Sequence, residues 1–217
     1  ISILPMAHMY GMSFEFLFEF IAGCHVFYLT RIPSPAIIAQ AFSEVKPKII
    51  ISVPLIIEKI IKKKVFPKIQ DPKLRLLMKM PGINKRVFEK ICDQVTKAFG
   101  GEFYEVIIGG AAFSQEVEKF LYRIGFHYTV GYGATECAPI ICYADYKTYV
   151  PGSCGRAAKN MQVKVVSEDP ANIPGEILAK GPNVMLGYYT NEEATKGSSD
   201  ADGWFHTGAL GLTAESG

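Results

Sequence analysis

Apolar residues in the first part of the chain recur mainly at helical spacing. Those of residues 14–21 form a helical stripe, and Leu17 interrupts the alternation that a strand through the same phenylalanines would need. Ser34 followed by a proline is typical of a helix start, so we expect a second helix over residues 34–45. A short strand is expected between these helices, over residues 26–29.

Short continuous apolar runs predict buried strands farther along the chain. They are residues 48–53, 104–108 and 128–130. The first two runs flank a basic stretch, residues 55–99, whose apolar side chains repeat every four residues near its end, which predicts helices. A further helix is expected over 114–122, with Ser114 as its N-cap. Strands separated by helical stretches imply a parallel sheet with helices on both faces.

The pattern changes after about Tyr149. Glycine and proline become frequent, and short alternating strands are expected over 162–166 and 176–179. Short alternating strands separated by glycine and proline predict an antiparallel, barrel-like second unit. The expected fold class is therefore α/β: a parallel sheet with helices on both faces in residues 1–150, followed by part of a β-rich, barrel-like subdomain in 151–217.

Charge is unevenly distributed along the chain. The 217 residues carry a formal net charge of +2 and are 49% hydrophobic, which argues against a disordered chain and gives no support for nucleic-acid binding. Residues 58–97, however, hold twelve Lys/Arg and four Asp/Glu. Such a stretch is either a solvated helix face or a contact with an anionic membrane surface, and the sequence leaves both interpretations open.

Cysteine usage and hydropathy indicate a cytoplasmic protein. The five cysteines are odd in number and none forms a CxxC pair, so neither a disulfide framework nor a zinc site is expected. The most apolar stretch, residues 12–29, is interrupted by two glutamates and a histidine, which argues against a membrane span. Ile1 opens directly into a strand-like run, and we expect the chain to be a piece of a longer protein.

The clearest local chemistry is a hexapeptide, GYGATE, that directly follows a predicted strand. Gly131 and Gly133 let the backbone approach a ligand closely, and open α/β sheets bind ligands at the carboxyl ends of their strands. Tyr132 offers a ring that can stack on a base. Thr135 offers a hydroxyl for a phosphate or carboxylate, and Glu136 offers an oxygen ligand for Mg²⁺. The alternative is an ordinary strand-to-loop turn with a surface glutamate.

Seven segments, in the same order along the chain, resemble the motifs of adenylate-forming acyl-CoA synthetases, the ANL superfamily. They are residues 4–11 (LPMAHMYG), 109–113 (GGAAF), 131–136 (GYGATE), 151–156 (PGSCGR), 175–177 (GEI), 180–189 (KGPNVMLGYY) and 202–208 (DGWFHTG). Collinear segments are far more specific than any single glycine pattern. The basic helical stretch, which contains residues 88–91 (FEKI), most resembles the long-chain fatty acid branch.

The resemblance implies a two-step reaction that uses ATP, Mg²⁺ and coenzyme A. The carboxylate of a long-chain fatty acid attacks the α-phosphate of ATP, which gives acyl-AMP and pyrophosphate. The thiol of coenzyme A then attacks the acyl-AMP, which gives the thioester and AMP. Residues 1–150 would be the nucleotide- and acyl-binding subdomain. A synthetase for aryl or shorter acids is the alternative within the same family.

By family position, the GYGATE hexapeptide would bind the nucleotide. Tyr132 would hold the adenine. Charge builds up on the phosphate oxygens during the first step, and a donor from Thr135 and a cation held by Glu136 would stabilise that charge. The side chains of Tyr132, Thr135 and Glu136 suit these contacts, and the specific role of each is what the resemblance implies.

Two further segments would line the acyl and thiol side of the site. The turn at Gly110, Ala111 and Ala112 would border the adenine and acyl pocket, where small residues leave room. His8 would lie near the reacting carboxylate and the thiol path, and the alternative for His8 is a structural histidine in the core. The other three histidines match no catalytic role and are interpreted as structural.

One position of the nucleotide site departs from the family motif. Where the family has Asp, this chain has Ala209. That Asp accepts hydrogen bonds from the ribose hydroxyls and Ala cannot, so we expect nucleotide affinity to fall by about one to two powers of ten. A non-catalytic nucleotide-binding protein, or pseudo-enzyme, is therefore the alternative to a synthetase.

Two other parts of the family's machinery would lie outside these residues. The phosphate-binding loop with its Lys would precede Ile1, and the small C-terminal domain with its Lys would follow Gly217. We therefore expect the isolated 217 residues to show no ATP–pyrophosphate exchange with palmitate and Mg²⁺. Apolar surface that the missing parts normally cover would favour a dimer.

Overall fold

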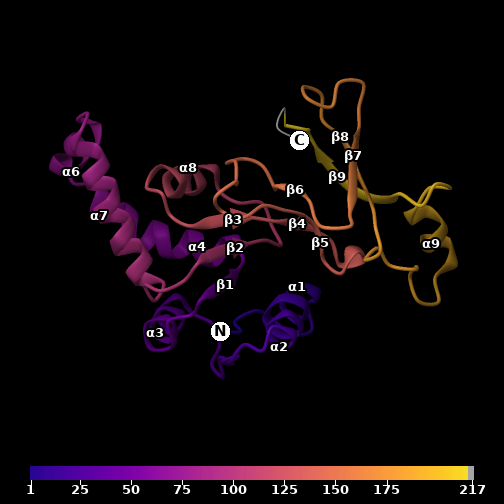
Figure 1. Cartoon of the computed structure of the whole chain (residues 1–217), viewed down its shortest axis with the longest axis horizontal. Coiled ribbons are helices and arrows are strands. Elements are labelled where there is room, and N and C mark those ends of the chain that lie inside the picture. The colour runs from indigo at the N-terminus through magenta and orange to yellow at the C-terminus, as the bar shows by residue number, and fades with distance from the viewer. Residues whose placement is uncertain (215–217) are drawn as a thin grey trace. The chain divides into compact units, whose positions relative to one another are not determined.

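The computed structural model of the chain describes residues 1–214, and contacts divide the chain into two compact units (Figure 1). Unit 1 comprises Ile1–Val130 and Asp145–Gly152, and unit 2 comprises Gly131–Ala144 and Ser153–Gly217. The chain therefore passes between the units more than once. The assignment of separate functional subdomains to residues 1–150 and 151–217 stays a prediction.

Unit 1 is built on a three-stranded parallel sheet with the order β1–β2–β3. The strands are β1 (Ile49–Ser52), β2 (Glu105–Ile108) and β3 (Tyr128–Val130). All three form where a continuous apolar run predicts a buried strand. The register pairs Ser52 with Ile108 and Ile108 with Val130, so the three carboxyl ends lie side by side.

Helices connect and cover these strands. In Figure 1, α8 lies above the strands of the sheet and α3 lies below them. The helical segments are α1 (Met9–Gly11), η1 (Met12–Leu17), α2 (Phe18–Ile21), α3 (Pro35–Val45), α4 (Pro54–Ile60), η2 (Ile61–Val65), α5 (Phe66–Ile69), α6 (Pro72–Lys79), α7 (Ile83–Ala98) and α8 (Gln115–Arg123). This arrangement confirms the predicted α/β class. Within residues 1–214, no helix combines the length and the apolar character that crossing a membrane requires.

Of the two N-caps predicted from the sequence, one forms the expected capping hydrogen bond and the other does not. Ser34 caps α3 as predicted, because its hydroxyl accepts the N–H of Ile37 at 3.3 Å. Ser114 lies at the N-cap of α8, but its side chain makes no capping hydrogen bond, and its N–H donates to the carboxylate of Glu58 at 2.9 Å. The strand expected over residues 26–29 is reduced to one parallel bridge between Ser2 and Tyr28, because no longer partner strand lies beside it.

Residues 9–21 form the helix that their spacing predicts, with a π-helical turn, η1, in its middle. Glu15 of η1 is buried, and its carboxylate accepts the N–H groups of Ile3, at 3.0 Å, and Leu4, at 2.8 Å, together with the hydroxyl of Ser2. Burial raises the pKa of Glu15 in spite of these hydrogen bonds. The glutamate that interrupts the apolar stretch therefore holds the N-terminal segment against the helix.

The core of unit 1 lies between the sheet and its helices. The fully buried side chains include Ile38, Phe42, Ile57, Ile60, Val95, Phe99, Val106 and Leu121. The predicted four-residue stripe of α7 contributes Ile91, Val95 and, just past the helix end, Phe99. The sheet is thus packed firmly enough to fix the turns that follow its strands.

Unit 2 contains two three-stranded antiparallel sheets, ordered β4–β5–β6 and β7–β8–β9. Its elements are β4 (Tyr132–Gly133), η3 (Thr135–Cys137), β5 (Ile140–Tyr143), β6 (Arg156–Ala157), β7 (Gln162–Val166), β8 (Gly175–Lys180), α9 (Glu192–Ser198) and β9 (Phe205–Gly211). Its small core comprises Cys137, Ile141, Met161, Ala179 and Phe205. Burial raises the pKa of Cys137 to about 11, so this cysteine is an inert core residue.

Candidate functional site

The turn after β2 is the part of the candidate site that unit 1 carries. The N–H of Gly109 donates to the carbonyl of Ser52 at 3.1 Å, which ties the turn to the neighbouring strand end. Gly110 has φ +87°, a conformation that favours glycine. Gly110, Ala111 and Ala112 are all exposed, so the predicted small-residue lining is accessible within this unit.

Tyr10 connects the first helix to the same end of the sheet. Its buried hydroxyl donates to the carbonyls of Ser52, at 3.4 Å, and Ile107, at 3.2 Å. A side chain added at Gly110 would have its Cβ 3.9 Å from the ring of Tyr10. The ring and hydroxyl of Tyr10 therefore hold the start of α1 beside the turn after β2.

His8 is the N-cap of α1 and is exposed, which excludes the alternative of a core histidine. Its Nδ1 accepts the N–H of Tyr10 at 3.1 Å. A neutral histidine whose Nδ1 accepts must carry its proton on Nε2, so this ring has a donor free for a ligand. Through Tyr10, His8 and Gly110 lie at one end of the sheet, and the catalytic role of His8 stays a prediction.

Within residues 131–136, the protein's own backbone requires a glycine at position 133. A Cβ at Gly133 would lie 1.9 Å from the carbonyl oxygen of Pro139, and the N–H of Ala134 donates to that same oxygen at 2.8 Å. The sequence predicts that Gly133 admits a ligand. The structure contains a close approach of β4 and the start of β5 at this glycine, and the approach of a ligand to Gly133 stays a prediction.

Glu136 lies in η3 and is joined to the 180–189 segment of unit 2. Its carboxylate accepts the hydroxyl of Tyr188 at 2.9 Å, and its carbonyl accepts the N–H of Met185 at 2.7 Å. The hydrogen bond to the carboxylate raises the pKa of Tyr188. Glu136 is half-buried and Thr135 is exposed, so both predicted ligand contacts keep access to solvent.

Tyr132 is joined to the turn that contains Ala209. Burial raises the pKa of Tyr132, and a hydrogen bond with Thr207 opposes that shift. The hydroxyl of Thr207 donates to the carbonyl of Ile177 at 2.7 Å and accepts the N–H of Ala209 at 3.1 Å. One threonine therefore connects the predicted adenine residue with the position where the family's ribose-binding Asp is replaced.

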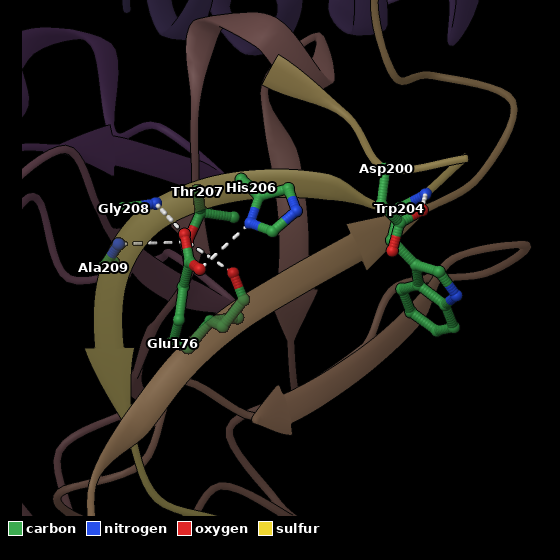
Figure 2. Close-up of polar contacts among 8 residues, drawn as sticks. Glu176, Asp200, Trp204, His206, Thr207, Gly208 and Ala209 are labelled. Carbon is green, nitrogen blue, oxygen red and sulfur yellow. Dashed lines mark hydrogen bonds and ion pairs between the residues drawn. The ribbon is translucent and has the colours of Figure 1, made fainter. Parts of the chain in front are cut away.

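Figure 2 shows how β8 holds the same turn of β9. The carboxylate of Glu176 accepts the N–H of Gly208 at 3.1 Å and pairs with Nδ1 of His206 at 3.0 Å. The hydrogen bond with His206 is the main reason why the pKa of Glu176 is lowered, and the bond from Gly208 adds to it. His206, interpreted as structural, thus takes part in a hydrogen bond that helps to orient residues 206–209.

Comparison with known proteins decides the family. Residues 1–189 match the family of AMP-binding enzymes. The chain belongs to this family. It is 39% identical over 119 residues to 4-coumarate–CoA ligase 2 of Oryza sativa subsp. japonica, a match that covers 49% of the chain and 21% of that protein.

Two other comparisons, one with a relative and one with a solved structure, cover nearly all of this AMP-binding chain. It is 29% identical over 238 residues to the peroxisomal long chain acyl-CoA synthetase 6 of Arabidopsis thaliana, which covers 98% of the chain and 33% of that protein. Its fold is similar to that of ATP-bound MatB from Rhodopseudomonas palustris, with a TM-score of 0.73 and 23% identity over 100% of the chain and 38% of that structure. The chain thus spans a third or less of the curated relatives described here.

Three residues that organise the candidate site of this AMP-binding chain were not predicted from the sequence as site residues. They are Tyr10, Asn183 and Thr207. The side-chain amide of Asn183 donates to the carbonyls of Cys137, at 2.6 Å, and Ile140, at 3.0 Å, and so fixes both ends of the turn after Glu136. Each of the three lies inside a segment that resembles a family motif, which is the signal that could have drawn attention to it.

Proposed function

We propose that this chain is part of an AMP-forming acid–thiol ligase that activates a long-chain fatty acid and transfers it to coenzyme A. The observation that carries the proposal is the alignment of a long chain acyl-CoA synthetase with 98% of the chain. In the first step a carboxylate oxygen bonds to the α-phosphorus of ATP and pyrophosphate leaves. In the second the sulfur of coenzyme A bonds to the acyl carbon and AMP leaves.

The nucleotide would be bound by residues of unit 2. Tyr132 would stack on the adenine, and its hydrogen bond with Thr207 would fix the ring beside the turn that faces the ribose in the family. The exposed hydroxyl of Thr135 would donate to a phosphate oxygen as negative charge builds up there. Ala209 would leave the ribose hydroxyls without the acceptor that the family's Asp supplies.

Glu136 is the residue that would hold Mg²⁺. Residues 1–214 contain no group of three or more His, Cys, Asp or Glu that could bind a metal by themselves. A single carboxylate nevertheless fits Mg²⁺, which keeps several waters and is commonly bound by one or two carboxylates together with substrate phosphates. Tyr188 occupies one oxygen of Glu136, and the other would face the cation. Bound there, Mg²⁺ would neutralise phosphate charge.

The acid and the thiol would meet residues of unit 1. The exposed turn at Gly110, Ala111 and Ala112 would border the acyl chain and the adenine, since its side chains are small. His8 would present its Nε2 proton to the reacting carboxylate or to the path of the thiol. The cap bond to Tyr10 holds the imidazole in the tautomer that this donation needs.

A ligase for an aryl acid is the second candidate, because the rice 4-coumarate–CoA ligase is the more identical relative over the part that it covers. A non-catalytic nucleotide-binding protein is the third, and Ala209 is the residue that favours it. Both keep the nucleotide site proposed above and differ in what lies next to it. The experiment must therefore distinguish the contribution of the acid to binding affinity from that of the nucleotide.

Non-hydrolysable acyl-adenylate analogues make that separation. The dissociation constants of hexadecanoyl, coumaroyl and acetyl analogues would be measured on the same chain. The proposal predicts that the hexadecanoyl analogue binds at least about tenfold more tightly than the others, because each buried methylene adds about 0.8 kcal/mol. Tyr132→Ala should weaken all three by about tenfold or more, since stacking on a base contributes about 1–3 kcal/mol.

The outcomes separate the candidates. A preference for the coumaroyl analogue would contradict the long-chain proposal and favour the aryl-acid ligase. Equal, tight binding of AMP and all three analogues would favour a nucleotide-binding protein. ATP–pyrophosphate exchange with palmitate is expected to stay at the level of a no-protein blank for these 217 residues, and turnover well above the blank would contradict that expectation.

We also propose peripheral membrane contact through the basic residues of 58–97. Lys62, Lys63 and Lys64 are exposed on η2, and each Lys or Arg near an anionic surface contributes about 1 kcal/mol. The alternative is a solvated helix face. Sedimentation with anionic and with neutral vesicles at two salt concentrations tests this. The absence of binding at both salt concentrations favours the solvated face, and binding that needs neither anionic lipid nor low salt also contradicts the proposal.

A further inference from the structure

A pocket of about 370 Å³ lies among α5, α6 and α8 of unit 1. Its apolar lining comprises Phe66 and Ile69 of α5, Met78 of α6 and Phe120 of α8. All four side chains are half-buried, and the rings of Phe66 and Phe120 meet edge to face with their centroids 5.3 Å apart. The pocket therefore has an apolar floor that the fold holds in place.

Cations dominate the rim of this pocket. Arg75 and Lys79 of α6 and Arg123 of α8 border it, together with one carboxylate, Glu116. All four are exposed, and none of them takes part in an ion pair among residues 1–214. The guanidinium of Arg123 lies over the ring of Phe88, 4.8 Å from its centroid, which orients this cation at the rim.

We propose that this pocket binds a dissolved anionic amphiphile, a molecule with a short alkyl chain and a carboxylate or phosphate head. The alkyl chain would contact Phe66, Met78 and Phe120, and the head would pair with Arg75, Lys79 and Arg123. Small-molecule sites measure about 300–1,000 Å³, so a volume of about 370 Å³ suits a short chain. The excess of cations over the single Glu116 selects a negative head.

The proposal does not rest on the proposed ligase activity. The lining residues lie outside the seven collinear segments that resemble the family's motifs, although those of α5 and α6 belong to the basic stretch 55–99. The binding is measured without ATP. Loss of amphiphile binding would therefore leave the ligase proposal intact. Failure of the acyl-adenylate experiment would likewise leave this site intact.

Titration calorimetry of the chain with decyl phosphate as the probe tests the pairing of chain and head. We expect binding of one molecule, and at least about tenfold weaker binding of decanol and of inorganic phosphate, because each offers only one half of the interaction. Equal affinity for decanol would overturn the role of the cations. Equal affinity for inorganic phosphate would overturn the role of the apolar floor.

Paired variants locate the binding in this pocket. Arg75→Gln with Lys79→Gln should weaken decyl phosphate binding at least about tenfold, whereas Lys85→Gln with Arg86→Gln, exposed cations of α7 outside the pocket, should leave it unchanged. Equal weakening by both pairs would mean that the anion is attracted by the positive charge of the chain as a whole, and it would overturn the proposal.

A second pair of variants tests the apolar floor. Met78→Gln should weaken binding, while Leu76→Gln, on the same helix but 62% exposed and outside the pocket, should not. Circular dichroism establishes that all variants fold. Unchanged binding in both pocket variants would place the ligand elsewhere and overturn the proposal. Sedimentation with anionic vesicles without binding of dissolved decyl phosphate would make a bilayer the occupant and overturn it as well.

Discussion

The two units hold their parts of the candidate site by different means. In unit 1, the turn after β2 and the start of α1 are tied to the ends of buried strands through Gly109 and Tyr10. In unit 2, the loop that contains Glu136 is fixed by side chains that follow it by 43 to 52 residues, from Asn183 and Tyr188. The first arrangement depends on buried strand ends, and the second depends on part-buried and exposed hydrogen bonds beside the small core that contains Cys137.

This difference predicts how each unit responds to substitution. Loss of a buried acceptor in unit 1 leaves backbone donors without partners inside the protein, which costs free energy of unfolding directly. Loss of one contact in unit 2 mainly frees a loop, so ligand affinity should suffer along with a smaller loss of stability. Single substitutions in each unit test this difference.

Glu15→Ala should have the largest effect on stability. The substitution removes the carboxylate that accepts the N–H groups of Ile3 and Leu4, and we expect the free energy of unfolding to fall by about 3 kcal/mol. Urea denaturation followed by circular dichroism measures it. Glu19→Ala, at a half-exposed position of the same helical segment, is the control, and a similar loss in both variants would contradict the buried-acceptor role.

Gly133→Ala should have the next largest effect. Its Cβ would lie 1.9 Å from the carbonyl oxygen of Pro139, so β4 and β5 must move apart, at a cost of about 2 kcal/mol. The fluorescence of Trp204, the one tryptophan of the chain, reports unfolding of unit 2. Gly197→Ala in α9 meets no atom within 4 Å and should be neutral or stabilising, whereas a neutral Gly133→Ala would refute the close approach.

Asn183→Ala should be milder. It removes two hydrogen bonds to the carbonyls of Cys137 and Ile140, and we expect the free energy of unfolding of unit 2 to fall by about 1 kcal/mol. AMP affinity should fall as well, because the turn after Glu136 is freed. Asn172→Ala removes an exposed contact to Asp169 in the same unit and should change neither quantity. A loss of unfolding free energy without a loss of AMP affinity would show that the hydrogen bonds of Asn183 do not shape the nucleotide site.

The smallest expected effect is the pH dependence that Glu176 contributes. Because the hydrogen bond with His206 lowers the pKa of Glu176, its stabilising contribution is complete above the ordinary glutamate pKa and is lost as pH falls through the lowered value. The difference in unfolding free energy between the wild-type chain and Glu176→Gln should therefore shrink between about pH 6 and pH 3. A difference in unfolding free energy that stays constant over this range would contradict a stabilising role of the ionised Glu176 carboxylate.

The elements that the sequence predicts well are those whose signals are local. α3 runs from Pro35 to Val45, with Ser34 as its N-cap, because its cap, its proline and its apolar stripe are all local to residues 34–45. β1 and β2 follow from continuous apolar runs that must be buried. Residues 26–29 fail as a strand because a strand needs a partner, and only Ser2 lies beside them.

In the candidate site, too, contiguous residues could be predicted from the sequence and contacts between distant segments could not. The GYGATE loop is visible in the sequence because its glycines and side chains are contiguous. The contact of Tyr132 with Thr207 and that of Glu136 with Tyr188 join segments far apart in the chain, and no periodicity encodes such a pairing. The backbone of Pro139 approaches Gly133 only in the folded chain, so the sequence gives no signal of that contact, and the approach of a ligand to Gly133 stays a prediction.

In the proposed function, the GYGATE loop and the turn at Ala209 bind one adenine nucleotide. Ala209→Asp restores the missing acceptor, and the dissociation constant of AMP measures its effect. We expect affinity to rise by about one to two powers of ten, because a carboxylate there would accept from the ribose hydroxyls. Leu210→Asp adds the same charge at the next, 73% exposed position and should change nothing. Unchanged AMP affinity in Ala209→Asp, or an equal gain in both variants, would contradict the claim.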